Sequence, residues 1–108
     1  MKFFTTSLLA VMTVASVAGA AIAKETTVKM DKMKFVPDTI TVAKGDTVTW
    51  VNADTTKQPH NVVGKTGAFK SKPVMMPGDK YSWKADKAGT FEYTCTFHPG
   101  MNGKVIVK

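Results

Sequence analysis

The chain has 108 residues, a single cysteine, two histidines and a formal net charge of +7. This length predicts one domain, and the single cysteine excludes an intramolecular disulfide. The basic residues are lysines spread along the chain, without the arginine-containing clusters of a nucleic-acid-binding module, so we expect no nucleic-acid partner. The positive charge favours either solubility or attraction to acidic partners.

The first segment has the pattern of a secretory signal peptide. Lys2 supplies a positive charge, residues 3–23 are uncharged and mostly apolar or small, and the segment ends with the small-residue pattern Ala21-Ile22-Ala23. The alternative is a retained membrane anchor, because the apolar run approaches the ~20 residues of a spanning helix. We predict cleavage after Ala23, no membrane anchor thereafter, and export of residues 24–108 to the periplasm as one domain.

The exported region alternates between short strand patterns and turns. Strands are predicted at 26–30, 39–42, 47–51, 61–63, 81–84, 90–95 and 104–107. No segment shows helical periodicity. Seven or eight short strands with frequent turns predict an all-β, antiparallel Greek-key β-sandwich. We expect the core to contain Trp50, Trp83, Phe91 and Tyr93, since aromatic side chains contribute much of the burial in a small sandwich.

The segment Cys95-Thr96-Phe97-His98-Pro99-Gly100-Met101 carries the chemistry. It follows a strand pattern in which Cys95 shares the inward face with Phe91 and Tyr93. Intervals of three residues allow one tight loop to direct Cys95, His98 and Met101 to a single point. His60 is the only other histidine, so the predicted ligand set is His60, Cys95, His98 and Met101.

These four ligand types select the metal. Structural zinc sites favour cysteine-rich sets with at most two histidines, and thioether is not among their usual ligands. Two imidazoles and a thiolate with a weak axial thioether are typical of a blue-copper electron-transfer site. Copper would also occupy the lone thiol, which is otherwise open to oxidation in an exported protein. The sequence therefore predicts one type 1 copper ion.

Pro59-His60-Asn61-Val62, together with the Cys95–Met101 segment, resembles the cupredoxin family, and the Cys-x-x-His-x-x-Met spacing is similar to its amicyanin group. The resemblance implies a cupredoxin-like sandwich and a periplasmic, amicyanin-like electron carrier rather than an enzyme. It implies a monomer with transient redox partners: a donor dehydrogenase or cytochrome, and an acceptor c-type cytochrome or oxidase. It also implies that the Asn61 side chain is tied to Thr96.

In the same family the loop histidine reaches the surface within an apolar patch. The resemblance assigns this role to His98, with a patch formed by Met33, Pro59, Met75, Met76, Phe97 and Pro99. The chain departs from the amicyanin pattern at Phe97, where proline is usual, and at Gly100, where phenylalanine is frequent. The amine-dehydrogenase partner of amicyanins is therefore not carried over.

A copper-binding or copper-delivery protein is the alternative function. The thioethers of Met30, Met33, Met75 and Met76 are soft ligands that suit Cu(I). A multicopper enzyme is disfavoured, because such enzymes need further histidine-rich sites and this chain has two histidines.

Overall fold

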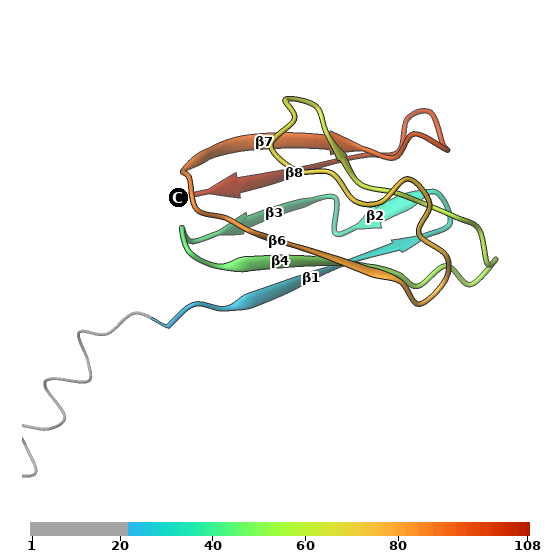
Figure 1. Cartoon of the computed structure of the whole chain (residues 1–108), viewed down its shortest axis with the longest axis horizontal. Helices are drawn as coiled ribbons and strands as arrows, with labels where there is room; N and C mark the ends of the chain where they lie inside the picture. Colours follow the sequence, from blue (N-terminus) through green and yellow to red (C-terminus); the bar gives the residue numbers. More distant parts are fainter. Residues whose placement is uncertain (1–21) are drawn as a thin grey trace, which may run out of the picture.

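The computed structural model describes residues 22–108, so the predicted signal peptide lies outside the described residues except for Ile22 and Ala23. Eight strands follow in order: β1 (Glu25–Asp31), β2 (Lys34–Val36), β3 (Thr39–Val42), β4 (Thr47–Asn52), β5 (Val63–Gly64), β6 (Lys80–Lys84), β7 (Gly89–Thr94) and β8 (Asn102–Val107). They form two four-stranded sheets, β2-β1-β4-β6 and β3-β8-β7-β5, which face each other as the two layers of a sandwich (Figure 1). The all-β sandwich is confirmed. Within residues 22–108, no helix is long and apolar enough to cross a membrane.

The expectation of wholly antiparallel pairing is wrong for two strand pairs. β1 pairs with β4 in parallel, and β3 pairs with β8 in parallel, whereas the other four pairs are antiparallel. The chain leaves the first sheet after β2, adds β3 to the second sheet, and returns to the first as β4. This crossing between layers makes β4 run in the direction of β1, and strand patterns in the sequence do not reveal it.

Strand β2 was not predicted from the sequence. It pairs with β1 across a two-residue turn in which Lys32 and Met33 have φ angles of 51° and 62°. Two-residue hairpins with positive φ at both positions usually contain glycine or asparagine, and this turn has neither. The predicted strand at 61–63 is also corrected, because β5 contains only Val63–Gly64.

The core lies between the two sheets. Trp50 and Tyr93 are fully buried and meet edge to face with ring centroids 5.3 Å apart. The core prediction is confirmed for these two rings, whereas Trp83 and Phe91 are partly buried and pack against the margin. Tyr93 lies opposite Gly103 on β8, where an added Cβ would come within 2.2 Å of Tyr93 Cζ. Gly103 is therefore required by the close approach of this ring.

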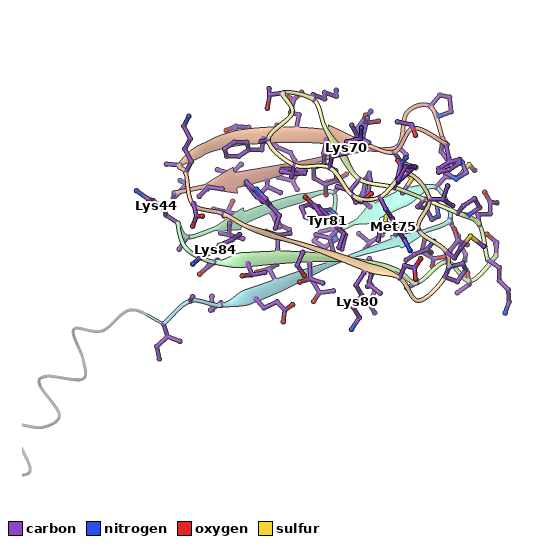
Figure 2. The ribbon with its side chains drawn as sticks, viewed as in Figure 1. Lys44, Lys70, Met75, Lys80, Tyr81 and Lys84 are labelled. Atoms are coloured by element: carbon purple, nitrogen blue, oxygen red, sulfur yellow. The ribbon has the colours of Figure 1, made fainter. Side chains whose placement is uncertain are left out.

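The two ends of the sandwich differ. The connection from β7 to β8, residues 95–101, lies at one end, and the C-terminus lies at the other (Figure 1). Lys44 and Lys84 lie at the C-terminal end, whereas Met75 lies among the loops nearer to the 95–101 connection (Figure 2). The predicted metal-binding loop thus extends from the end of the sandwich at which the turns are longest.

Candidate metal centre

Three of the four predicted ligands converge in the structure. The ligand atoms of His60, Cys95 and His98 all lie within 4.8 Å of one another. The Cys95 Sγ atom is 3.8 Å from His60 Nδ1. His60, Cys95 and Met101 are at most 2% exposed, while His98 is partly exposed. The cluster is therefore a buried site with one side chain near solvent.

Backbone hydrogen bonds hold the loop that carries Cys95, His98 and Met101. Cys95 follows Thr94, the last residue of β7, and its N–H donates to the Met101 carbonyl at 3.0 Å. The Met101 N–H donates to the His98 carbonyl, also at 3.0 Å, and the Thr94 hydroxyl donates to the Met101 carbonyl at 3.1 Å. Met101 is thus anchored at the base of the loop beside Cys95.

His60 is brought to the loop from a distant part of the chain. Its N–H donates to the Met75 carbonyl at 3.1 Å, and the Met75 N–H donates to the His60 carbonyl at 2.8 Å. This antiparallel bridge holds His60 next to His98, with ring centroids 4.8 Å apart and the ring planes tilted by 55°. The pairing also buries the Met75 side chain completely.

Asp54 is a site residue that sequence reasoning missed. Its Oδ2 atom lies 2.5 Å from His60 Nε2, and both side chains are fully buried. Burial alone would raise the pKa of Asp54, but hydrogen bonds from Thr56 and His60 hold this pKa well below its usual value. An ionised carboxylate only accepts hydrogen bonds, so His60 Nε2 is the donor to Asp54, and Nδ1 is the ring nitrogen that faces Cys95. An acidic residue six positions before a histidine is too ordinary a pattern to have indicated this contact.

Asn61 joins the two loops of the site. Its Oδ1 atom accepts from the Thr96 N–H at 2.8 Å, and its Nδ2 atom donates to Thr96 Oγ1 at 2.7 Å and to the Pro73 carbonyl at 3.0 Å. The link from the Asn61 side chain to Thr96, implied by the family resemblance, is confirmed. It fastens the segment after His60 to the segment after Cys95.

The residues expected to form an apolar patch around His98 differ in exposure. Met33, Met76 and Phe97 are exposed, but Met75 is fully buried and does not belong to the surface. His98 Nε2 lies 3.3 Å from the Pro59 carbonyl, which orients the ring. The burial of Met75 and of Met30 also removes half of the soft sulfur atoms on which the copper-delivery alternative depends.

The donors present fit copper. Because His60 Nε2 donates to Asp54, Nδ1 is its metal-facing nitrogen, and Cys95 and His98 would supply a thiolate and a second imidazole. One thiolate with two imidazoles matches the blue-copper set and leaves a structural zinc site short of cysteine. Met101 is buried, its carbonyl accepts from the Cys95 N–H, and its thioether would supply the soft fourth donor of the blue-copper set.

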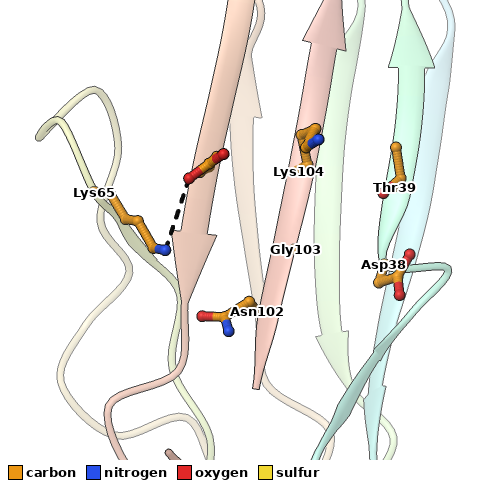
Figure 3. Close-up of a pocket in the computed structure, with 7 residues that line it drawn as sticks. Asp38, Thr39, Lys65, Asn102, Gly103 and Lys104 are labelled. Atoms are coloured by element: carbon orange, nitrogen blue, oxygen red, sulfur yellow. Dashed lines mark ion pairs between the residues drawn. The ribbon is translucent and has the colours of Figure 1, made fainter. Parts of the chain in front are cut away.

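One surface cavity of the described residues lies away from these ligands. It has a volume of about 310 Å³, and residues in or next to β3, β5, β7 and β8 line it, including Asp38, Thr39, Asn102 and Lys104 (Figure 3). The Lys65 ammonium and the Glu92 carboxylate are 3.7 Å apart at its margin, and both side chains are about half exposed (Figure 3). Exposed pairs of this kind contribute little to stability, and none of the predicted metal ligands reaches the cavity.

An eight-stranded two-layer sandwich with a His-Cys-His cluster at one end defines a cupredoxin. Residues 22–108 match the model of the copper-binding proteins of the plastocyanin/azurin family. The chain belongs to this family, and its cofactor is copper.

Two curated relatives and one solved structure are similar to it. Amicyanin-alpha of Methylorubrum extorquens is 36% identical, with 97% of this chain and 96% of that protein aligned. Amicyanin of Paracoccus versutus is 40% identical over 75% of this chain and 63% of that protein. The structure of a reduced amicyanin mutant superposes with a TM-score of 0.71 and is 38% identical, covering 84% of this chain and 88% of that one. The chain is accordingly an amicyanin-like blue copper electron carrier.

Proposed function

We propose that the chain carries single electrons between redox proteins through one type 1 copper ion held by His60, Cys95, His98 and Met101. The convergence of the His60, Cys95 and His98 ligand atoms within 4.8 Å carries this proposal. When bound, copper supplies a one-electron change between Cu(I) and Cu(II). Three of the four side chains come from one short loop, and His60 comes from a segment bridged to Met75.

The surroundings of the ligands keep them in place. Asp54 orients His60, Asn61 ties the two ligand segments together, and the Met101 carbonyl accepts from both Cys95 N–H and the Thr94 hydroxyl. Buried ligands with fixed hydrogen-bond partners change position little between two charge states, and partners around the ligands also tune a metal site. Small rearrangement is the property that an electron carrier needs.

Docking to partners would occur around His98, the one partly exposed ligand. The patch expected there keeps its exposed members Met33, Met76, Phe97 and Pro99 and the partly exposed Pro59, and Val74 adds a further exposed apolar side chain next to Met75. Pro59 contacts His98 directly, Phe97 precedes it, and Val74 and Met76 flank the Met75 strand position that pairs with His60. A small patch of this kind suits brief contacts, because weak redox complexes bury little surface.

The proposed partners are a donor dehydrogenase or cytochrome and an acceptor c-type cytochrome or oxidase. The amicyanins among its relatives support this range without selecting one protein from it. We further propose that the chain acts as a monomer in the periplasm after removal of residues 1–23, and that it has no catalytic activity of its own. The two histidines, both in the one metal cluster, support the last point.

A visible absorption spectrum tests the proposal. Addition of Cu(II) to the purified protein is expected to produce an intense thiolate-to-copper band, which disappears in Cys95→Ala and persists in Met76→Ala, where an exposed thioether outside the ligand set is removed. A colourless copper complex, or a band that survives in Cys95→Ala, would refute the assigned ligand set. Reduction of the blue protein by a donor and reoxidation by a c-type cytochrome, followed by stopped-flow absorbance, then tests the carrier role.

A further inference from the structure

Lys24 is the residue at which the described fold begins. Its backbone N–H donates to Asp46 Oδ1 at 3.0 Å, and its carbonyl accepts from the Thr47 N–H at 2.9 Å. Strand β1 starts at the next residue, Glu25, which is paired with Thr47 of β4. Ile22 and Ala23 are exposed and belong to no strand. The Ala23–Lys24 peptide bond is therefore the junction between accessible chain and the ordered sandwich.

Asp46 is a buried carboxylate that forms no ion pair within residues 22–108, although the Lys24 ammonium group acts on it at longer range. It is 4% exposed, and its Oδ2 atom accepts from the Ala43 N–H at 2.9 Å. Its backbone is also fixed, since its carbonyl accepts from the Ala85 N–H at 2.8 Å. The ion pairs found in residues 22–108 involve Asp54, Asp79 and Glu92, not Asp46. A buried charge is costly unless it is hydrogen-bonded and paired, and here the two hydrogen-bond donors to the carboxylate are neutral backbone amides.

We propose that the chain is processed at the Ala23–Lys24 bond and that the new α-ammonium group of Lys24 forms an ion pair with Asp46. An endopeptidase that recognises small residues would use Ala21 and Ala23, the pattern of a signal-peptide cleavage site. Water hydrolyses the C–N bond, leaving a carboxylate on Ala23 and an amine on Lys24 that takes up a proton. This inference rests on the proposed export and extends it to the fold of the mature protein.

Cleavage would change the charge at this position without moving the nitrogen atom. The same nitrogen that now donates to Asp46 as a neutral amide, 3.0 Å away, would donate as an ammonium group. Hydrogen bonds between ionised groups are roughly twice as strong as neutral ones. Strand β1 lies between β2 and β4 in its sheet. The ion pair would therefore fix Lys24, the residue directly before this interior strand. Cleavage would thus stabilise the sandwich as well as separate it from residues 1–23.

The site of cleavage is tested by expressing the full chain, residues 1–108, in a bacterial host, so that residues 1–23 direct the export. The intact mass and N-terminal sequence of the purified protein are expected to place Lys24 first. Any other first residue would overturn the inference. If that protein still turned blue with copper, the proposed electron-carrier function would stand while this inference failed.

The ion pair is tested by a double-mutant cycle. Because all described strands lie within residues 25–107, residues 24–108 are prepared from a fusion whose protease leaves no extra residue, with and without Ala23 retained. Retention of Ala23 is expected to lower the folding equilibrium constant on the order of tenfold with Asp46, and to have no effect with Asp46→Asn. Equal effects of Ala23 in both backgrounds would overturn the proposal.

A measurement on the unsubstituted protein covers the case in which Asp46→Asn fails to fold. NMR titration of the labelled α-amine is expected to give a pKa clearly above the ordinary ~8 for Lys24, because the Asp46 carboxylate stabilises the charged form. With Ala23 retained, the α-amine is displaced by one residue and its pKa is expected to be ordinary. An ordinary pKa in both proteins would contradict the ion pair.

Discussion

Asp54 and His60 form a fully buried carboxylate–imidazole pair, with Oδ2 and Nε2 2.5 Å apart. The other ring nitrogen, His60 Nδ1, lies 3.8 Å from the Cys95 sulfur. The pair determines which ring nitrogen of His60 faces the metal. It also places a negative charge one imidazole away from the copper. Both effects favour metal binding at His60 Nδ1, and both can be removed by changing one side chain.

Asp54→Asn is expected to weaken copper binding about 10–100-fold, as loss of a hydrogen-bond partner behind a metal-bound histidine usually does. The reduction potential should rise, because removal of a nearby negative charge disfavours Cu(II) more than Cu(I). Competition with a copper chelator and cyclic voltammetry measure the two effects. The matched control is Asp31→Asn, whose carboxylate accepts from Thr55 and not from His60. Equal affinities for the two variants would show that Asp54 does not act through His60.

Asn61→Ala should destabilise the protein by about 1–3 kcal/mol, because it removes three part-buried hydrogen bonds made by a buried side chain. The Asn61 side chain makes hydrogen bonds to the Thr96 N–H, the Thr96 hydroxyl and the Pro73 carbonyl. Urea denaturation of the apo-protein measures the free energy of unfolding without any contribution from copper. Asn102→Ala, at an exposed position on β8, is the control. If the two variants unfolded at the same urea concentration, the link between the ligand loops would contribute no stability.

Gly103→Ala is expected to lower the free energy of unfolding by about 1–3 kcal/mol, the usual cost of overpacking. An added Cβ would lie 2.2 Å from Tyr93 Cζ, so the Tyr93 ring or β8 must move. Near-ultraviolet circular dichroism should change with the Tyr93 environment. Gly67→Ala is a useful contrast, since a Cβ there meets nothing within 4 Å but the φ angle is +83°. Its cost should come from the backbone alone, with an unchanged aromatic spectrum. An unaltered spectrum for Gly103→Ala would contradict the close approach.

Tyr93→Phe should make the protein more resistant to alkali. Burial raises the pKa of Tyr93 from 10.0 to about 12, and its hydroxyl has no hydrogen-bond partner. A raised folded-state pKa contributes stability that is complete below pH 10 and is lost as the pH rises towards 12, since the unfolded chain releases the proton first. Two pKa units correspond to about 2.7 kcal/mol. The difference in unfolding free energy between Tyr93→Phe and the unsubstituted protein should therefore increase by that order from pH 9 to pH 12. A constant difference across this range would show that Tyr93 does not control the alkaline transition.

Local patterns in the sequence determined the fold class and the donor set. Period-two alternation in strands such as 90–95 indicated a sandwich because side chains of a strand alternate between its faces. The three-residue intervals from Cys95 to Met101 indicated a single metal-binding loop, and His60 followed as the one remaining imidazole. These inferences needed only neighbours in the chain, or the chemistry of the residue types themselves.

Only the tertiary structure decided how distant segments meet. The parallel pairing of β1 with β4 depends on the path of the chain between two sheets, and the burial of Met75 depends on its bridge to His60. Asp54 belongs to the metal site because loop folding brings its carboxylate to His60 Nε2. Asp46 lies far from that site, and the fold brings its carboxylate to the Lys24 N–H. Carboxylates are common in loops, and their partners are selected by position in space, which residue spacing does not encode.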